Sequence, residues 1–108
     1  MLIPLVVFAS DCKKYIEIYS AAEYAREIGT TEDWVVQNHK VNLWARQTNN
    51  GKGDVVGKLL PGSRALIIEE GPQEYKVKSP LNGSLGWINK IQVKKTLMQD
   101  AKTFEPCR

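Results

Sequence analysis

The chain offers few side chains that could carry out catalysis. Its two cysteines, Cys12 and Cys107, lie near opposite ends of the 108 residues, and His39 is the only histidine. The sequence contains no CxxC motif, and no motif places His39 beside a Cys or Ser nucleophile. A zinc or haem site and a nucleophile–base pair are therefore not indicated. We expect a protein without enzymatic activity, cofactor or bound metal.

The two cysteines could be in any of several chemical states. A disulfide between Cys12 and Cys107 would close a loop of about 95 residues and stabilise the fold by about 4 kcal/mol on the chain-entropy model. Such a bond persists only in an oxidising compartment. Both residues could instead be free thiols, or Cys12 could be lipidated, because "ASDC" resembles the lipoprotein box of bacterial envelope proteins. In that box, Leu is usual where Ala9 stands, and Gly or Ala where Asp11 stands. Cys12 cannot be both lipidated and paired.

The first ten residues, MLIPLVVFAS, carry no charge. They are too few for a transmembrane helix, which needs roughly 20 apolar residues. Their length fits the apolar region of a signal peptide, although no positive region precedes it, and Leu5-Val6-Val7-Phe8 has high strand propensity. We expect residues 1–11 to be the remnant of an export signal that begins upstream, an N-terminal strand of the fold, or a short membrane-associating tip.

The composition, with 43% hydrophobic and 25% charged residues, is typical of one small soluble domain with extensions. Residues 1–38 hold 3 Lys/Arg and 6 Asp/Glu, a net charge of −3, whereas residues 39–108 hold 12 and 6, a net charge of +6. The basic part could meet nucleic acid, anionic lipid or an acidic wall polymer. Its lysines are spread among acidic residues, which favours a solvated face and makes nucleic acid the less favoured partner. The candidates for such a stripe are Lys76, Lys78, Lys90, Lys94 and Lys95.

Residues 12–38 are expected to form an extension with one short helix. In "YSAAEYAREIG", Ser20 and Glu23 have the spacing of a capping box, and Gly29 can end the helix in the left-handed conformation. The preceding "KYIEIY" alternates, so it could be a strand or the first turns of that helix. In "TTEDWVVQ" a second cap is possible, but Trp34-Val35-Val36 favours a strand.

From Val41 onward the pattern is that of short strands separated by turns. The loop "RQTNNGKGD" is rich in Asn and Gly, Pro61-Gly62 and Gly71-Pro72 mark turns, and Asn82-Gly83 fits a hairpin. Five or six strands at this spacing predict a small barrel rather than a parallel sheet. The expected strands are VNLWA, VVGKL, RALIIEE, EYKVK, SLGWIN and IQV.

A glycine precedes the largest side chain in "SLGWIN". Glycine inside a strand marks a sharp bend or a close approach of another backbone, so we expect one of these at Gly86. The neighbouring Trp87 would then fill the narrow end of the barrel.

Residues 39–94 resemble a bacterial SH3-type domain, the SH3b family. The resemblance rests on "VNLWAR", "VVGKLLPGSRALII", "EYKVK", "NGSLGWI" and "IQV", which occur in the order and at the spacing of the family pattern. It covers about half of the chain and implies a small SH3-like barrel that binds rather than catalyses. The segments 1–11, 12–38 and 95–108, the last a C-terminal tail, lie outside it.

The chain departs from the family pattern where members most often bind ligands. Trp44-Ala45-Arg46-Gln47 stands where Arg-Ser-Gly-Pro is usual, and Glu74-Tyr75 replaces a pair of aromatic residues. Aromatic rings can stack on sugars or peptides, and a guanidinium can pair with a carboxylate. The candidate binding residues are Trp44, Arg46, Tyr75 and Trp87. For Tyr75 and Trp87 a place in the core is favoured over binding, whereas Trp44 replaces a usually polar residue and is expected to be exposed.

Together these features predict a non-catalytic binding or structural module of the bacterial cell envelope, exported to the periplasm and possibly held at the membrane by its N-terminus. Its partner would be a protein of an envelope assembly or peptidoglycan. The alternative is a basic SH3-like barrel that associates with nucleic acid in the cytoplasm.

Overall fold

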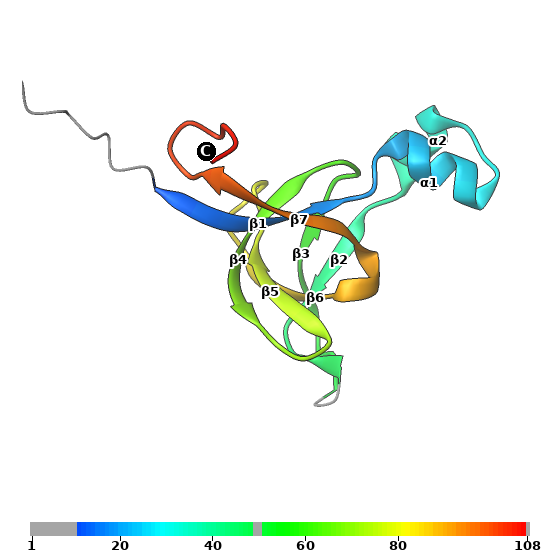
Figure 1. Ribbon diagram of the computed structural model, residues 1–108. Helices are drawn as coiled ribbons and strands as arrows, with labels where there is room; N and C mark the ends of the chain where they lie inside the picture. Colours follow the sequence, from blue (N-terminus) through cyan, green and yellow to red (C-terminus); the bar gives the residue numbers. More distant parts are fainter. Residues whose placement is uncertain (1–10, 49–50, 108) are drawn as a thin grey trace, which may run out of the picture.

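The computed structural model describes residues 11–48 and 51–107. This part of the chain folds into one antiparallel sheet with strand order β3-β2-β6-β5-β4-β1-β7 and two short helices (Figure 1). The prediction of a mainly β domain is confirmed, with seven strands in place of the expected five or six. The elements are β1 (Cys12–Ile18), α1 (Ala21–Ile28), α2 (Glu32–Asn38), β2 (Val41–Trp44), β3 (Val55–Leu59), β4 (Arg64–Glu70), β5 (Glu74–Lys78), β6 (Leu85–Asn89), the 3-10 helix η2 (Lys90–Gln92) and β7 (Val93–Asp100).

Strand β1 lies inside the sheet, between β4 and β7. Tyr15 is opposite Leu66 of β4 on one side and Leu97 of β7 on the other. The alternation of "KYIEI" fits a strand with two different faces. Ile16 and Ile18 are buried in the core, while Tyr15 and Glu17 point to the other face of the sheet. The open choice between strand and helix at this segment is settled as strand. β7 continues to Asp100, well into the segment expected to be a tail.

Both helices begin at side-chain caps. In α1 the Ser20 hydroxyl accepts from the Glu23 N–H at 3.1 Å and the Glu23 carboxylate accepts from the Ser20 N–H at 3.1 Å, as the capping box predicts. Gly29 ends it at φ 80°. The predicted strand at Trp34-Val35-Val36 is wrong. Thr31 caps α2, and an acidic first turn favours the helix over the strand preference of the valines.

The core lies against one face of the curved sheet. Its members are apolar side chains that alternate along the strands with residues of the opposite face. The buried cluster consists of Ile16, Ile18, Val41, Leu43, Leu59, Ala65, Tyr75, Val77 and Ile88.

Among the described glycines, Gly86 has the tightest contacts with neighbouring strands. A β-carbon placed there would lie 2.6 Å from the Leu43 β-carbon and 2.9 Å from Val56 Cγ2, closer than such atoms can come. The expected close approach at Gly86 is therefore confirmed. Side chains from β2 and β3 both press against the backbone of β6 at this position.

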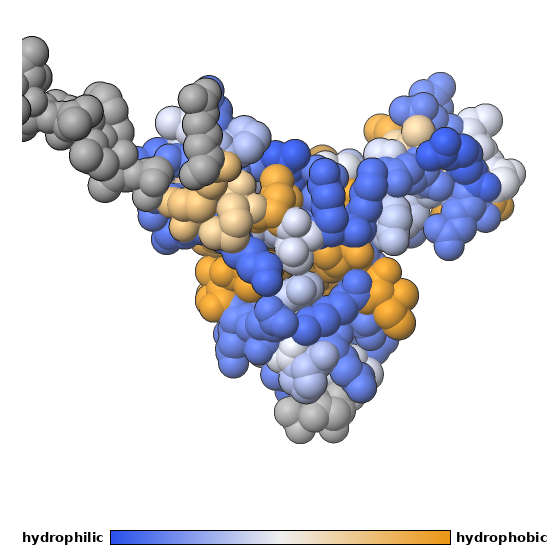
Figure 2. Space-filling model, in the orientation of Figure 1, coloured by the Kyte–Doolittle hydropathy of each residue, from blue (hydrophilic) through white to orange (hydrophobic). Residues whose placement is uncertain are grey.

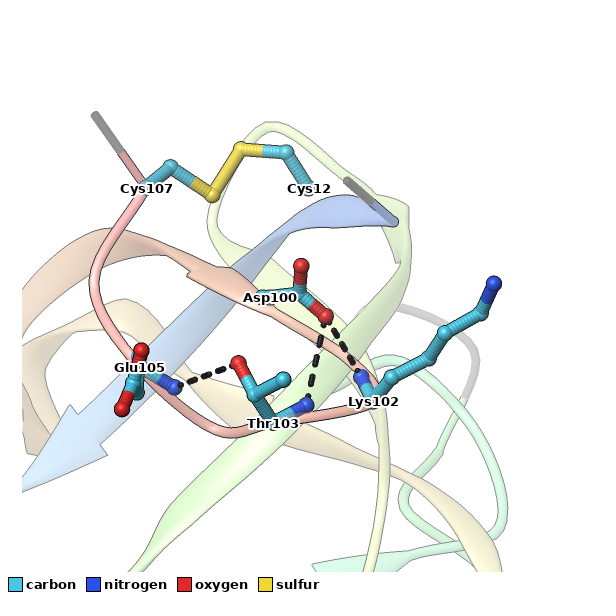
Figure 3. Close-up of a disulfide and its surroundings, with 6 residues drawn as sticks. All are labelled: Cys12, Asp100, Lys102, Thr103, Glu105 and Cys107. Carbon is cyan, nitrogen blue, oxygen red and sulfur yellow. Dashed lines mark hydrogen bonds between the residues drawn. A yellow bond between two sulfur atoms is a disulfide. The ribbon is translucent and has the colours of Figure 1, made fainter. Parts of the chain in front are cut away.

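The predicted disulfide joins Cys12, the first residue of β1, to Cys107, with the two Cα atoms 6.0 Å apart (Figure 3). Between them the chain turns back after β7. The Asp100 carboxylate accepts from the N–H groups of Lys102 and Thr103 at 2.8 and 3.3 Å, which forms this turn. The three alternatives for the leader concern residues 1–10, which lie outside the described residues, and Asp11.

We expect Gly86→Ala to lower the free energy of unfolding by about 1–3 kcal/mol, because the added methyl group overpacks the contact with Leu43. Urea unfolding followed by tryptophan fluorescence measures this. The matched control is Gly57→Ala in β3, where the new β-carbon would meet Ser84 Cβ at 3.1 Å and Leu43 Cδ1 at 3.4 Å, so its effect is smaller. A loss for Gly86→Ala no larger than that of the control contradicts this account.

We expect reduction of the disulfide to lower the free energy of unfolding by about 4 kcal/mol, because the bond closes a long loop in the unfolded chain. Urea curves with and without reductant give the value. In the Cys12→Ser/Cys107→Ser double variant, reductant changes nothing. A wild-type curve that is insensitive to reductant, with two titratable thiols after denaturation, would show that the bond does not form.

Candidate functional site

Two of the four predicted binding residues meet on the face of the sheet opposite the core. Trp44 of β2 lies directly across from Trp87 of β6 in the strand register. Gly86 and Ile88 face the core, so Trp87 between them faces the other way, and it is nevertheless only 8% exposed. Trp87 is therefore buried, although it is not a member of the main apolar cluster.

Trp44 is half-buried, and the ammonium group of a lysine lies over its ring. The Lys52 Nζ lies 5.2 Å from the ring centroid, within the range of a cation–π interaction. This contact places the long loop between β2 and β3 beside the indole. The site thus has an aromatic surface with a positive charge at its border.

A shallow hollow of about 240 Å³ adjoins Trp44. It lies between β2, the loop that follows it, the start of β5, and the 3-10 helix η2. Its lining residues are Asn42, Trp44, Thr48, Lys52, Glu74, Asn89, Ile91 and Gln92. Amide and hydroxyl groups predominate, and Ile91 beside them is 83% exposed. The hollow can form hydrogen bonds and apolar contacts, and it brings no nucleophile and base together.

Glu74 is the buried acid of this hollow, at 5% exposed. Its carboxylate accepts a hydrogen bond from the Thr48 N–H at 2.6 Å, which holds the loop after β2 against β5. In the sequence Glu74 was notable only as the replacement of an aromatic residue. Its structural role depends on a contact across 26 positions of the chain, which no local pattern reveals.

The other two predicted residues lie elsewhere. Tyr75 belongs to the core cluster, and the Lys90 Nζ lies 4.9 Å from its ring centroid. Arg46 is exposed in the loop after β2, where its backbone N–H donates to the Lys52 carbonyl at 3.1 Å. Neither lines the hollow at Trp44, so the structure brings together Trp44 and Trp87 and separates both from Tyr75 and Arg46.

The two helices form an arm that projects from the sheet (Figure 1). Apolar side chains lie on its surface, as Figure 2 shows, with Ile28 at 52%, Trp34 at 47% and Val36 at 57% exposed. The sequence does not indicate this apolar surface, because Trp34-Val35-Val36 favours a strand. A strand would have hidden alternate residues, whereas the short helix buries only Val35.

The only histidine has a packing role in this arm. The ring centroids of His39 and Tyr24 lie 4.4 Å apart, next to the edge-on pair of Tyr24 and Tyr19. Burial raises the pKa of the Tyr24 phenol above its usual value. The arm is joined to β7 by the Lys94 Nζ, which lies 2.9 Å from the Glu23 carboxylate.

A larger groove, of about 900 Å³, lies away from Trp44. It involves β1, β4 with the turn before it, the end of β5 with the turn after it, and β7 with the turn after it. No pattern in the sequence indicates this groove, because its residues come from four separate stretches of the chain and share no motif. The lining residues are Tyr15, Glu17, Gly62, Arg64, Leu66, Lys78, Ser79, Pro80, Gly83, Gln99, Ala101 and Phe104.

Comparison with protein-family models, with curated proteins and with solved structures finds no match to this chain. Among the described residues, no helix has the length and apolar character needed to cross a membrane.

We expect the contact between the arm and β7 to depend on acid pH. Hydrogen bonds from Lys94 and from the Ser20 N–H lower the pKa of Glu23 from 4.5 to about 2. A carboxylate whose pKa is lowered on folding stabilises the fold fully above its unfolded pKa, and this contribution is lost as the pH falls through the folded pKa. Carbon-13 NMR titration of the side-chain carboxyl measures this midpoint. In Lys94→Gln it moves up toward 4.5; an unchanged midpoint contradicts the pairing.

Proposed function

We propose that the protein is a non-catalytic binding domain of the bacterial cell envelope and that the surface around Trp44 contacts a protein partner. The observation that carries this proposal is the half-buried Trp44 beside a shallow hollow bordered by the exposed Ile91. Aromatic and apolar groups in a partly open site, surrounded by amides, are the usual anchors of protein interfaces.

The SH3-like character of residues 39–94 belongs to the same proposal. Its support is that four of the five segments of the SH3b resemblance form β2 to β6, which are neighbours in the order β3-β2-β6-β5-β4, while IQV lies in η2 and at the start of β7. The close approach at Gly86, where β2 and β3 both contact β6, also supports a strongly curved unit. In such a unit the surface at Trp44 corresponds to the region that members of the family most often use for ligands.

The disulfide supports an exported location. Bonds such as Cys12–Cys107 persist in the periplasm and at cell surfaces and are rare in the cytosol. The sulfur of Cys12 that forms this bond cannot also carry a lipid. An envelope domain without an anchor on Cys12 fits these features.

The exposed arm favours a protein over peptidoglycan as the partner. Ile28, Trp34 and Val36 add apolar area to the contact surface, and such area is typical of protein interfaces rather than of sugar sites. Peptidoglycan remains the second candidate, because the indole of Trp44 and the amides around it could also stack on and bind a glycan or its peptide.

Photo-crosslinking in intact cells of the source organism tests the proposal. A benzophenone side chain at position 91 should give a discrete protein adduct that is lost in Trp44→Ala, whereas the same probe at the exposed position 58 of β3 should give none. The matched substitution Trp34→Ala, in the arm, should weaken the adduct less than Trp44→Ala does.

Two other outcomes would overturn it. Co-sedimentation with peptidoglycan sacculi that Trp44→Ala reduces, without a protein adduct, assigns the surface to the wall polymer. A gel shift with DNA that weakens steeply with salt would support the cytoplasmic nucleic-acid alternative, because phosphate contacts release counterions.

A further inference from the structure

The 900 Å³ groove lies on the face of the sheet opposite the core. Tyr15 and Glu17 of β1 alternate with the core residues Ile16 and Ile18, so they point to this other face. In the register with β4, Tyr15 is opposite Leu66 and Glu17 is opposite Arg64, and these four side chains line the groove.

Hydrogen bonds fix both walls of the groove. On one side, the buried Ser79 donates its hydroxyl to the Lys58 carbonyl at 3.0 Å, which anchors the turn with Pro80. On the other side, the turn with Ala101 and Phe104 follows β7 and is closed by the disulfide (Figure 3). The Ala101 N–H donates to the Asp11 carbonyl at 2.8 Å, so this wall is joined to the start of β1.

The polar side of the groove is organised around Arg64. Its Nε donates to the Glu17 carboxylate at 2.9 Å and its Nη1 donates to Oε1 of Gln99 at 2.7 Å. The Lys95 Nζ lies 3.7 Å from the same carboxylate, so the one acid that lines the groove is already paired.

Gln99 carries an unused donor at this site. The residue is only 3% exposed, and its Oε1 accepts from Arg64, so its amide nitrogen is the atom left to donate. Within residues 11–48 and 51–107, no hydrogen bond satisfies this nitrogen, and no ion pair satisfies Lys78. Among the described residues, the only buried side-chain polar atom without a hydrogen-bond partner is the Tyr24 hydroxyl oxygen, so the Gln99 nitrogen keeps contact with solvent. A ligand in the groove can therefore reach this donor and replace the water that it contacts.

The charge and the apolar surface of the groove indicate which chemical groups a ligand should carry. Arg64 and Lys78 against Glu17 leave a net charge of +1, and the free groups are all donors. Next to them lies an apolar surface of Tyr15, Leu66 and the exposed Phe104. A ligand that complements both parts carries a carboxylate beside an apolar group.

We propose that this groove binds an extended peptide segment of a partner protein, in which an acidic side chain accepts hydrogen bonds from Gln99, Arg64 and Lys78 and a neighbouring apolar side chain packs on Leu66 and Phe104. The volume exceeds that needed by a single anion, and the groove is open to solvent, so a peptide chain can enter and leave it. One net positive charge is too little for nucleic acid. The groove lies on different strands from Trp44, so the inference does not depend on the function proposed for that surface.

Selection from a phage-displayed library of random peptides tests the groove, with counter-selection against the variant Gln99→Glu. That variant keeps an oxygen that can accept from Arg64, but it replaces the amide donor with a negative charge. It therefore still binds peptides that recognise other surfaces, including the one at Trp44, and the counter-selection removes those peptides. We expect the peptides specific to the wild type to share an Asp or Glu next to an apolar residue.

One selected peptide, synthesised with its acid and with the matching amide, is then titrated into nitrogen-15-labelled protein. We expect amide shifts at Tyr15, Leu66 and Gln99, a loss of affinity of tenfold or more for the amide peptide, and a fivefold or greater loss in Lys78→Gln. The control Lys58→Gln, an exposed lysine outside the groove, should bind as the wild type does. The dispersion of the spectra shows that each variant is folded.

Several results would overturn the proposal. These are no enrichment over the counter-selection, selected peptides without an acid, equal binding of the acidic and amide peptides, or shifts confined to the surface around Trp44.

Discussion

The position of β1 between β4 and β7 is the constraint on which the rest of the structure depends. β7 has no other neighbour in the sheet, so without β1 it would have no hydrogen-bonding partner strand. The inward side of β1 supplies Ile16 and Ile18 to the core, and its outward side supplies Tyr15 and Glu17 to the large groove. One strand thus completes the core on one face and forms the floor of a candidate binding site on the other.

The disulfide acts on this same strand. Because Cys12 is the first residue of β1, its bond to Cys107 fixes the end of β1 that is farthest from the helical arm. The chain between β7 and Cys107 is thereby kept as a wall of the groove, although most of its residues are exposed. The position of this wall of the groove therefore depends on one covalent bond, and reduction of that bond would release the wall from the start of β1.

Short sequence patterns predicted those features of the fold that depend on interactions between residues close together in the chain. The cap of α1 at Ser20, the turns, the five strands between Val41 and Asn89 and the close approach at Gly86 all follow from short spacings of residue types. The expected strand IQV is wrong at Ile91 and Gln92, which belong to the 3-10 helix η2 that precedes β7. Such patterns could not predict the contacts between segments that are far apart in the chain. The register of β1 against β7, the bond from Glu74 to the loop after β2, and the meeting of Arg64 with Gln99 each join residues far apart in the chain. The helix α2 was missed because its cap outweighed the strand preference of two valines.

The two candidate surfaces are held by one strand. Glu74, at the start of β5, lines the hollow at Trp44, and Lys78, at its end, lines the large groove. Four residues of extended chain place these positions about 13 Å apart. Because β5 is paired on both sides within the sheet, the distance between the surfaces is set by the backbone and not by a flexible linker. A partner that occupied both would gain from this fixed spacing, since its second contact would form at a high effective concentration. Two separate partners could bind side by side without either site having to change shape.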